Sequence, residues 1–259
     1  MKIMIAEIER AAREAGAILL EAASTGIQVS KKENHELVTT ADLMSEKFLQ
    51  KRLSEIEPSA GFLGEESWTG DYPDPPFWVV DPLDGTNNYA HGYPVFSVSI
   101  AFWNGSSIEA GCIYDPSRNE LFSASRGKGA RLNDSVITTT DTDRLSGCIL
   151  ATGFPYHRKS DNLGVNLEIL KYFLGRVQGI RRGGSAALDL AYVAAGRLDG
   201  FWEEHLKPWD MAAGALIVRE AGGEISSFAS KHWDIFSAGI VASGKSIHPE
   251  IQSGVKLSG

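Results

Sequence analysis

The stretch Trp78-Val-Val-Asp-Pro-Leu-Asp-Gly-Thr-Asn-Asn88 places two carboxylates, Asp81 and Asp84, directly after a short apolar run. Such a run is typical of a buried strand, and Pro82 is expected to end the strand. The Asp-Gly-Thr-Asn sequence that follows supplies turn residues and a capping sequence for a helix. We therefore expect both carboxylates to lie at the carboxyl end of a strand.

The turn after this strand can place several oxygen atoms around one point. One tight turn would aim the side chains of Asp81 and Asp84, together with the Leu83 carbonyl, at a common position. Three such oxygens make half of an octahedral site for a hard divalent cation such as Mg2+, and positions remain for water and substrate phosphate. The backbone N–H groups of Gly85 and Thr86 open the next helix and can meet the anion that accompanies the metal.

The composition of the chain argues against several other classes of protein. With 259 residues, 43% of them hydrophobic, the chain can bury a substantial core in one large domain or two smaller ones. The net charge of −8 and the lack of a long basic tract argue against a general nucleic-acid or anionic-membrane surface. No apolar run reaches the ~20 residues that span a bilayer, and the N-terminus becomes charged too early for a signal peptide. We expect a cytoplasmic protein in which Cys112 and Cys148 are buried free thiols.

Hydrophobic periodicity predicts two structurally different halves. Helices are expected over residues 2–24 and 42–58, and mostly antiparallel strands near residues 61–64, 77–80, 95–102, 107–114 and 120–124. A polar run at residues 138–144 is expected to link the halves, and strands and helices alternate beyond it, which implies a layered α/β domain. We therefore predict an N-terminal α+β domain over residues 1–144 and a C-terminal α/β domain over residues 145–259.

Glycines at residues 126–130 and acidic residues at positions 65 and 66 need separate interpretations. Arg126-Gly-Lys-Gly-Ala130 favours a hairpin connection over a nucleotide-binding loop. Two adjacent glutamates usually lie on the surface. Glu65, however, ends one apolar strand and Asp81 ends another, so pairing these strands side by side would bring their carboxyl ends together.

Three further segments have both a structural and a functional interpretation. Asp210 is an apt N-cap for a helix that we expect to start there, and it could also reach a metal if the fold brings the two places together. Gly184 and Ser185 precede another helix, where they favour either an anion or hydroxyl site or an N-cap with close packing. Glu203 follows a strand, where it faces either a polyol substrate or solvent.

Taken together, three blocks of sequence strongly resemble the inositol monophosphatase family of Mg2+-dependent, lithium-sensitive phosphatases. The resemblance extends over nearly the whole chain, and the order and separation of the blocks make it specific. It implies a layered αβαβα sandwich, usually a homodimer, with the active site between the two halves. The three blocks are Gly-Glu65-Glu66-Ser, Asp81-Pro-Leu-Asp84-Gly-Thr86-Asn and Trp209-Asp210-Met-Ala-Ala-Gly with Glu220-Ala-Gly-Gly.

The resemblance also implies roles for individual residues. Two or three Mg2+ ions are expected, with Glu65 and Thr86 orienting the attacking water and the Gly85 and Thr86 amides holding the phosphate. Lys31 and Asp42 match the family's mobile loop and the adjoining helix start. The implied metal ligands are Glu65, Asp81, the Leu83 carbonyl, Asp84 and Asp210. The implied substrate contacts are Asp84, Gly85, Thr86, Gly184, Ser185, Ala186, Glu203 and Asp210.

The expected reaction is direct in-line hydrolysis of a phosphate monoester, with inositol 1-phosphate as the favoured substrate. Histidinol phosphate, fructose 1,6-bisphosphate and adenosine 3′,5′-bisphosphate stay open as alternatives. Four basic residues could accept a second phosphate or simply lie on the surface: Arg158, Lys159, Arg181 and Arg182. Glu203 favours a polyol, because a carboxylate accepts hydroxyl hydrogen bonds and repels a second phosphate. From a different class, a regulatory role in binding nucleic-acid machinery also stays open, although direct nucleic-acid binding is not expected.

Overall fold

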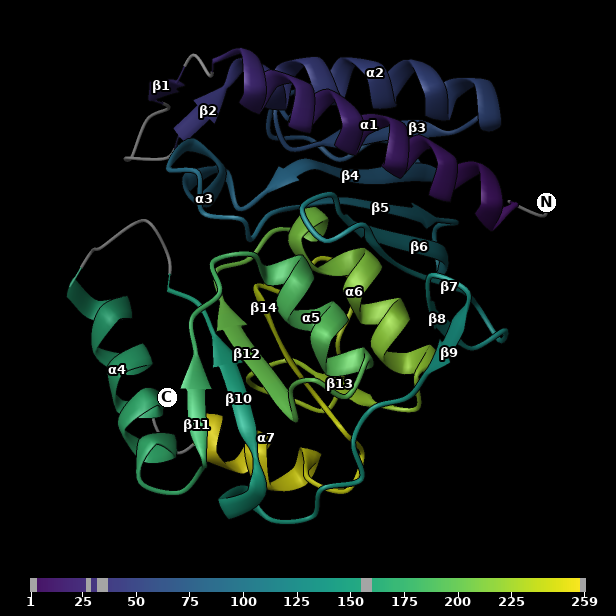
Figure 1. Ribbon diagram of the computed structural model, residues 1–259. Helices are drawn as coiled ribbons and strands as arrows, with labels where there is room; N and C mark the ends of the chain where they lie inside the picture. Colours follow the sequence, from purple (N-terminus) through teal and green to yellow (C-terminus); the bar gives the residue numbers. More distant parts are fainter. Residues whose placement is uncertain (1–3, 27–28, 32–36, 155–159, 257–259) are drawn as a thin grey trace.

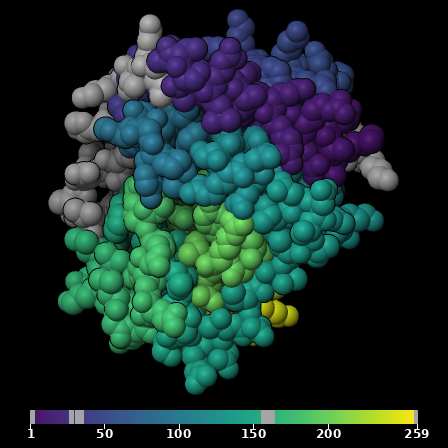
Figure 2. Space-filling model, in the orientation of Figure 1, coloured from purple at the N-terminus to yellow at the C-terminus, as the bar shows by residue number. Residues whose placement is uncertain are grey.

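The computed structural model describes residues 4–26, 29–31, 37–154 and 160–256, and it consists of five layers. In Figure 1, α1 and α2 lie above the seven-stranded sheet and α5 and α6 lie below it, beside the five-stranded sheet, while α4 and α7 lie on the far side of that second sheet, at the left and at the bottom. The predicted αβαβα sandwich of α and β layers is therefore confirmed. In Figure 2 the purple and blue N-terminal residues occupy the top of the molecule, and green residues of the second half fill much of the lower part.

Two N-terminal helices, α1 (Ile5–Thr25) and α2 (Thr40–Ile56), cover the outer face of the seven-stranded sheet. The buried residues of α1 recur at helical spacing, with Ile8, Ala12, Ala15 and Leu19 all fully buried. Thr39 directly precedes α2 as its N-cap, and its side chain caps the first turn. Ahead of it, the short strands β1 (Val29–Lys31) and β2 (Leu37–Thr39) pair antiparallel.

The seven-stranded sheet runs in chain order from β3 to β9, and every neighbouring pair is antiparallel except the parallel pair β3 and β4. This confirms the predicted, mostly antiparallel first half. The short helix α3 (Thr86–Ala90) follows the turn at Gly85, as predicted, whereas periodicity did not predict the small strands β8 and β9. The strands are β3 (Gly61–Gly64), β4 (Phe77–Asp84), β5 (Ser97–Trp103), β6 (Ile108–Asp115), β7 (Glu120–Ser125), β8 (Ala130–Leu132) and β9 (Ser135–Ile137).

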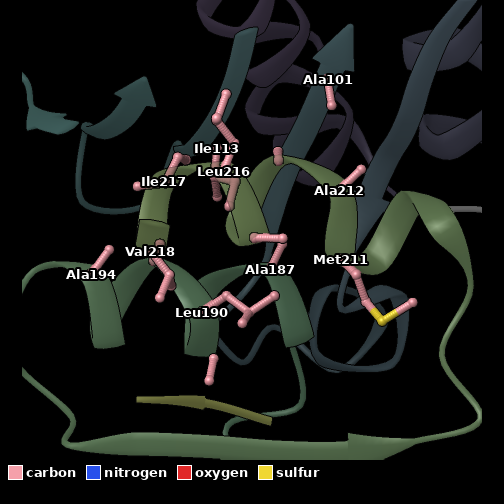
Figure 3. Packing of buried hydrophobic residues seen from close by; sticks show 14 of the residues in the cluster. Ala101, Ile113, Ala187, Leu190, Ala194, Met211, Ala212, Leu216, Ile217 and Val218 are labelled. Atoms are coloured by element: carbon pink, nitrogen blue, oxygen red, sulfur yellow. The ribbon is translucent and has the colours of Figure 1, made fainter. Parts of the chain in front are cut away.

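Helices α5 (Ala186–Ala194) and α6 (Pro208–Glu220) form the middle layer and are buried on nearly all sides between the sheets. Small residues make this close packing possible. A Cβ at Gly111 of β6 would lie 3.1 Å from the Cα of Ala213, so the sheet approaches the α6 backbone directly. Figure 3 shows apolar side chains of both helices packed against each other and against the sheet above.

The second sheet has the order β11-β10-β12-β14-β13, with β10 parallel to both β11 and β12 and with β14 antiparallel to its neighbours. Helices α4 and α7 cover its outer face, and a 3-10 turn at Leu145–Gly147 precedes it. The elements are β10 (Ile149–Thr152), α4 (Ser160–Leu174), β11 (Gly179–Arg181), β12 (Gly200–Glu204), β13 (Glu224–Ser226), β14 (Gly239–Ser243) and α7 (His248–Lys256).

The glycine turn at residues 126–130 connects β7 and β8, as predicted for a hairpin. Its amides are held by a carboxylate from the same chain. Glu220, at the end of α6, accepts the backbone N–H groups of Gly127 at 2.7 Å, Lys128 at 3.0 Å and Gly129 at 2.8 Å. Converging backbone amides of this kind form an anion-binding concavity. Here the side chain of Glu220 fills it.

Two other expectations concern the cysteines and the membrane. Cys112 and Cys148 are buried free thiols, as predicted. Among the helices that the structure describes, none combines the length and apolar character needed to cross a membrane.

Candidate functional site

The carboxyl ends of β3 and β4 meet, as the sequence predicted. The strands run parallel with Gly64 opposite Val80, so Glu65 and Asp81 follow at neighbouring positions. The Glu65 backbone N–H donates to the Val80 carbonyl at 3.2 Å and continues the pairing beyond β3. Two acidic side chains that are 16 positions apart in sequence therefore come from adjacent strand ends.

Strand β4 does not end at Pro82, which corrects the sequence-based prediction. It continues to Asp84, with Asp81 opposite Ser99 and Asp84 opposite Ser97, so the pairing contains a bulge between the two acids. Proline is tolerated at a bulge because no ladder hydrogen bond needs its missing N–H group. The Leu83 N–H donates to Asp81 Oδ1 at 2.9 Å, which fixes this carboxylate against the bulge.

Gly85 makes the sharp change of direction that follows β4. Its φ of 90° lies in the left-handed region, and a Cβ there would lie 2.9 Å from the Val95 carbonyl and 3.3 Å from the Gly184 carbonyl. Only glycine fits both the backbone angle and this close approach. The turn from the first half of the chain is thereby brought directly against Gly184 in the second half.

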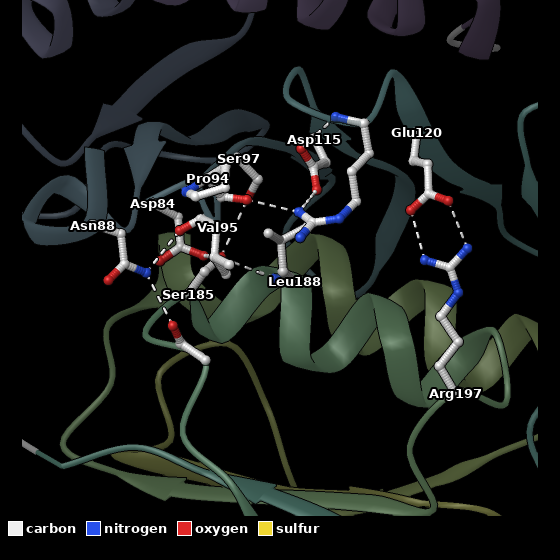
Figure 4. Close-up of polar contacts among 12 residues, drawn as sticks. Asp84, Asn88, Pro94, Val95, Ser97, Asp115, Glu120, Ser185, Leu188 and Arg197 are labelled. Carbon is white, nitrogen blue, oxygen red and sulfur yellow. Dashed lines mark hydrogen bonds and ion pairs between the residues drawn. The ribbon is translucent and has the colours of Figure 1, made fainter. Parts of the chain in front are cut away.

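Asp84 connects the two halves through hydrogen bonds (Figure 4). The Ser185 hydroxyl and the Ala187 N–H, the latter at 2.9 Å, both donate to Asp84 Oδ2. Ser185 also caps α5 by accepting the Leu188 N–H at 3.3 Å, so the predicted N-cap is confirmed. Asn88 adds a second connection, because its side-chain amide donates to Val95 O at 2.7 Å and to Gly183 O at 2.9 Å. Sequence reasoning gave Asn88 no role.

Thr86 and Asp42 form a second hydrogen-bonded pair in this region. The Thr86 hydroxyl lies 3.0 Å from Asp42 Oδ1 and 3.0 Å from the Leu83 carbonyl, and both of these atoms are acceptors. Asp42 is buried in the first turn of α2, where it also accepts the Thr39 N–H at 2.8 Å. Burial raises the pKa of Asp42, although these hydrogen bonds act in the opposite direction. The pair orients the Thr86 hydroxyl so that its oxygen can accept a hydrogen bond from water.

Asp210 is the third residue of α6, and not its N-cap. The helix begins at Pro208, whose fixed φ suits the first helical position, and Asp210 Oδ2 accepts the Lys207 N–H at 2.6 Å. The Ser99 hydroxyl donates to the Trp209 carbonyl at 3.2 Å. Ser99 is the strand partner of Asp81, so the start of α6 lies against the part of the sheet that carries this acid. Sequence spacing alone could not show that contact.

Glu203 lies near the end of β12, and its carboxylate rests against Gly153 at the end of β10. Any Cβ at Gly153 would overlap this carboxylate, so the contact requires glycine. Burial raises the pKa of Glu203 to about 8. The positive charge of Arg182 lowers this pKa, and the negative charge of Asp84 raises it by a smaller amount. Sequence reasoning missed Gly153, because no local pattern links it to a residue 50 positions later.

A cleft of about 730 Å³ brings the predicted site residues together. Ser185 does not line it, because its side chain is buried against Asp84, and Asp42 lies behind Thr86. The Lys31 side chain lies outside the described residues. The predicted residues that line the cleft are Glu65, Asp81, Leu83, Asp84, Gly85, Thr86, Gly184, Ala186, Glu203 and Asp210.

The carboxylates in the cleft raise one another's pKa values. Burial raises the pKa of Asp81 well above its usual value, and three neighbouring acids add to the effect. Burial and repulsion from Glu65 do the same to Asp210, while burial raises the pKa of Asp84 to about 6. So much negative charge in one buried place requires either protons or a cation.

The donor chemistry fits a hard cation, since all candidate ligands are oxygen atoms. Within the described residue ranges, however, no three His, Cys, Asp or Glu side chains already have an arrangement that could hold a metal ion. Asp81, Asp84 and Asp210 each use a carboxylate oxygen in a hydrogen bond to their own chain instead.

Comparison with known proteins gives consistent matches over the length of the chain. The model of the inositol monophosphatase family matches residues 2–256. Nus factor SuhB of Pseudomonas aeruginosa is 43% identical over 240 residues, which cover 90% of this chain and 88% of that protein. Inositol-1-monophosphatase of Rhizobium meliloti is 46% identical over 198 residues, which cover 76% and 74% of the two chains.

A solved structure also resembles this fold closely. The crystal structure of the extragenic suppressor protein suhB from Bartonella henselae superimposes with a TM-score of 0.90 at 43% identity. The superposition covers 96% of this chain and 97% of that one.

Proposed function

The chain belongs to the inositol monophosphatase family, and on this premise we propose that it is a Mg2+-dependent phosphate monoester hydrolase that prefers inositol 1-phosphate. The family consists of phosphatases that are generally metal-dependent and act on small phosphorylated substrates. The observation that carries the proposal is the meeting of acids from four chain segments in one cleft, next to the oriented hydroxyl of Thr86. We further propose that the enzyme is a homodimer, as the family resemblance implies, and that it is cytoplasmic, as its sequence composition favours.

The metal ligands proposed are Glu65, Asp81, the Leu83 carbonyl, Asp84 and Asp210. Two or three bound Mg2+ ions would lower the pKa of a water molecule and stabilise the charge on the leaving alkoxide. The bulge in β4 supplies three of these ligands within four residues. The short connections from Asp84 to α5 and from Ser99 to α6 hold the two halves of the chain around them.

We assign orientation of the attacking water to Glu65 and Thr86. The Thr86 hydroxyl donates a hydrogen bond to Asp42 or to the Leu83 carbonyl, so its oxygen can accept a hydrogen bond from that water. Glu65, at the edge of the same cleft, would accept the second proton of the water. Attack in line with the leaving oxygen then transfers the phosphoryl group directly to water, without a covalent enzyme intermediate.

The substrate contacts proposed follow the two sides of the cleft. The Gly85 and Thr86 amides would hold the phosphate, while the leaving alcohol would meet Glu203, Gly184 and Ala186. The contact expected of Ser185 is not proposed, because its side chain is buried against Asp84. Asp84 and Asp210 border both groups. Glu203 favours a polyol, because a carboxylate accepts hydrogen bonds from several hydroxyl groups. A role for Lys31 in binding the anionic substrate stays a prediction.

The two-domain division at residue 144 is also a proposal. Residues 138–144 contain no helix or strand and lead from the seven-stranded sheet to the five-stranded one, which supports it. The cleft then lies between the domains, with Asp81 on one side and Glu203 on the other.

Phosphate release from a substrate panel tests the proposed reaction. We expect inositol 1-phosphate to be hydrolysed with Mg2+, and lithium to inhibit the reaction. Histidinol phosphate, fructose 1,6-bisphosphate and adenosine 3′,5′-bisphosphate are the competing substrates. Of the basic residues considered for a second phosphate, Arg182 lines the cleft, whereas Arg158 and Lys159 lie outside the described residues. Absence of phosphate release from every monoester would refute the enzymatic proposal.

The relatives named Nus factor SuhB favour a second candidate, a regulatory binding role. The two candidate functions differ in their need for Asp84. The phosphatase reaction requires its carboxylate, whereas a docking surface does not. A pull-down with purified wild-type chain and an Asp84→Asn variant, compared with phosphatase assays on the same samples, separates them. If wild type and Asp84→Asn both capture the same binding partner specifically and neither releases phosphate, the regulatory role is favoured.

A further inference from the structure

The first two turns of α2 bury three polar side chains behind the candidate cleft. Asp42, Ser45 and Glu46 are all buried and follow one another at helical spacing, so they share one face of the helix, called the polar face of α2 below. Leu49 and Leu53 continue this face with apolar side chains, which is what packing alone favours. Among the described residues that line the cleft, none belongs to α2.

Each member of the polar face holds a different segment of the candidate site. The Ser45 hydroxyl donates to the Pro82 carbonyl at 3.0 Å, inside the bulge of β4. Glu46 Oε2 accepts the Glu66 N–H at 2.8 Å, just beyond the end of β3. Asp42 accepts a hydrogen bond from the first residue of α3, as described above. One helix therefore supports the three segments that surround the proposed metal ligands of the first half.

The contact between Glu46 and the Glu66 N–H constrains the direction of the Glu65 side chain. A peptide group is planar, so Glu46 sets the orientation of the peptide that joins Glu65 to Glu66. On the other side of Glu65, its own N–H is held by the Val80 carbonyl at 3.2 Å. Both peptide groups that flank the Glu65 Cα are therefore held, and the backbone conformation in turn restricts the rotamers of its side chain.

Gly64 makes room for the Glu46 carboxylate. A Cβ at Gly64, the last residue of β3, would overlap this carboxylate, so the contact requires glycine. Burying a carboxyl group costs free energy unless it is hydrogen-bonded. The chain thus gives up a side chain at Gly64 and buries an acid in order to place Glu46 against the segment that carries Glu65.

We propose that Glu46 is a positioning residue for Glu65, the proposed metal ligand, an inference that rests on the proposed phosphatase function. Glu46 is not among the residues that line the cleft, so it acts through the backbone that joins Glu65 to Glu66. This contact keeps the Glu65 carboxylate ready for Mg2+ and the attacking water. The property of Glu46 that matters is its reach to the Glu66 N–H and not its charge.

Two substitutions at position 46 separate reach from charge. Glu46→Asp keeps the carboxylate but is one methylene shorter, so it withdraws from the Glu66 N–H. Glu46→Gln keeps the length and an oxygen that can accept this N–H. Calorimetry without substrate measures Mg2+ binding to the chelator-treated chain. We expect Glu46→Asp to weaken this binding about 10- to 100-fold, the usual cost of losing a group that supports a metal ligand, and Glu46→Gln to weaken it less.

Glu220→Asp is the matched control, because Glu220 also accepts backbone N–H groups through its carboxylate and is not among the residues that line the cleft. It should lower the melting temperature without changing the affinity for Mg2+. An equal loss of Mg2+ affinity in Glu220→Asp and Glu46→Asp would mean that reduced stability causes both losses, and it would overturn the positioning role.

The order of the two losses at position 46 decides between reach and charge. Unchanged Mg2+ affinity in Glu46→Asp, or a larger loss in Glu46→Gln than in Glu46→Asp, would overturn the positioning role. Glu46→Gln preserves the side-chain volume and tests the proposal even if Glu46→Asp folds poorly, because a loss of about 100-fold in Glu46→Gln would also overturn it.

Wild type separates this proposal from the proposed function. If wild type binds Mg2+ and releases phosphate from inositol 1-phosphate while both variants match it, the positioning role fails and the phosphatase function stands. If wild type neither binds Mg2+ nor releases phosphate, both proposals fail.

Discussion

Replacing Gly153 with alanine should weaken recognition of a polyol substrate without touching the residues proposed for catalysis. The Glu203 carboxylate lies against Gly153, and a Cβ there would overlap it. The same strand register that puts Thr152 beside Trp202 places these two residues next to each other. Gly153→Ala must therefore displace the carboxylate from the position in which it would meet the substrate hydroxyls.

The expected size of the effect follows from the hydrogen bonds that are lost. Burial raises the pKa of Glu203 to about 8, so the comparison is made above that pH, where the carboxylate is charged. A hydrogen bond to a charged acceptor contributes about 1.5–3 kcal/mol, which corresponds to a loss of roughly 10- to 150-fold in kcat/KM. We expect a loss in this range for inositol 1-phosphate, carried mainly by KM. Phenyl phosphate has no hydroxyl group for Glu203 to bind, so its hydrolysis should change by less than about twofold.

A double-mutant cycle with Glu203→Ala separates this effect from general damage to the fold. In the Glu203→Ala background there is no carboxylate to displace, so Gly153→Ala should cost little more activity. Gly175→Ala serves as the control substitution, because a Cβ at Gly175 meets nothing within 4 Å. An unchanged KM in Gly153→Ala, or an equal loss in both backgrounds, would refute the coupling between Gly153 and Glu203.

Three further predictions follow from other contacts. Glu220→Gln should lower the free energy of unfolding by about 1–3 kcal/mol, because three turn amides lose a charged acceptor. Urea unfolding measures this change, and unchanged stability would contradict the prediction. Burial lowers the pKa of His248 in the folded protein below its usual value of 6.5. As pH falls, His248 is therefore protonated in the unfolded chain before it is protonated in the folded one. Wild type should lose stability as pH falls through about 6.5. His248→Gln should show a smaller loss between pH 7.5 and 5.5 in the same assay, and an identical pH dependence would exclude this residue as the cause. Thr86→Val should lower kcat about 10²- to 10⁴-fold in a phosphate-release assay, while the melting temperature changes little. Near-normal turnover would show that Thr86 does not orient the attacking water.

Most helices and strands were predictable because long helices and alternating strands leave clear periodic patterns, whereas the order of the five layers was implied by the family resemblance. The ends of helices and strands were harder to predict where one residue type fits two different positions. Pro82 indicates the end of a strand, yet a bulge accommodates it and β4 continues to Asp84. Asp210 is a good N-cap by residue type, yet Pro208 begins the helix and Asp210 caps it from the third position.

The candidate site was predictable where its residues are close in sequence or follow paired strands. Asp81 and Asp84 are neighbours along one strand, and parallel pairing of β3 and β4 brings Glu65 to them. Contacts between distant segments leave no such pattern. Gly153 beside Glu203 follows only from the order of strands in the second sheet.

Asn88 illustrates the same limit for a polar contact. Its amide binds carbonyls at Val95 and Gly183, in both halves of the chain, and only the packed structure brings these together. The sequence around Asn88 gives no sign of either carbonyl partner.

The most direct test of the central claim is phosphate release from inositol 1-phosphate by wild type and Asp84→Asn, after chelation and after Mg2+ is added back. Asparagine keeps an oxygen that can accept the Ser185 and Ala187 hydrogen bonds, so the variant should fold and melt like wild type. We predict that wild type loses activity on chelation and regains it with Mg2+, whereas Asp84→Asn stays inactive throughout. Near-normal turnover by Asp84→Asn, or activity of wild type that survives chelation, would contradict the proposed metal-dependent mechanism.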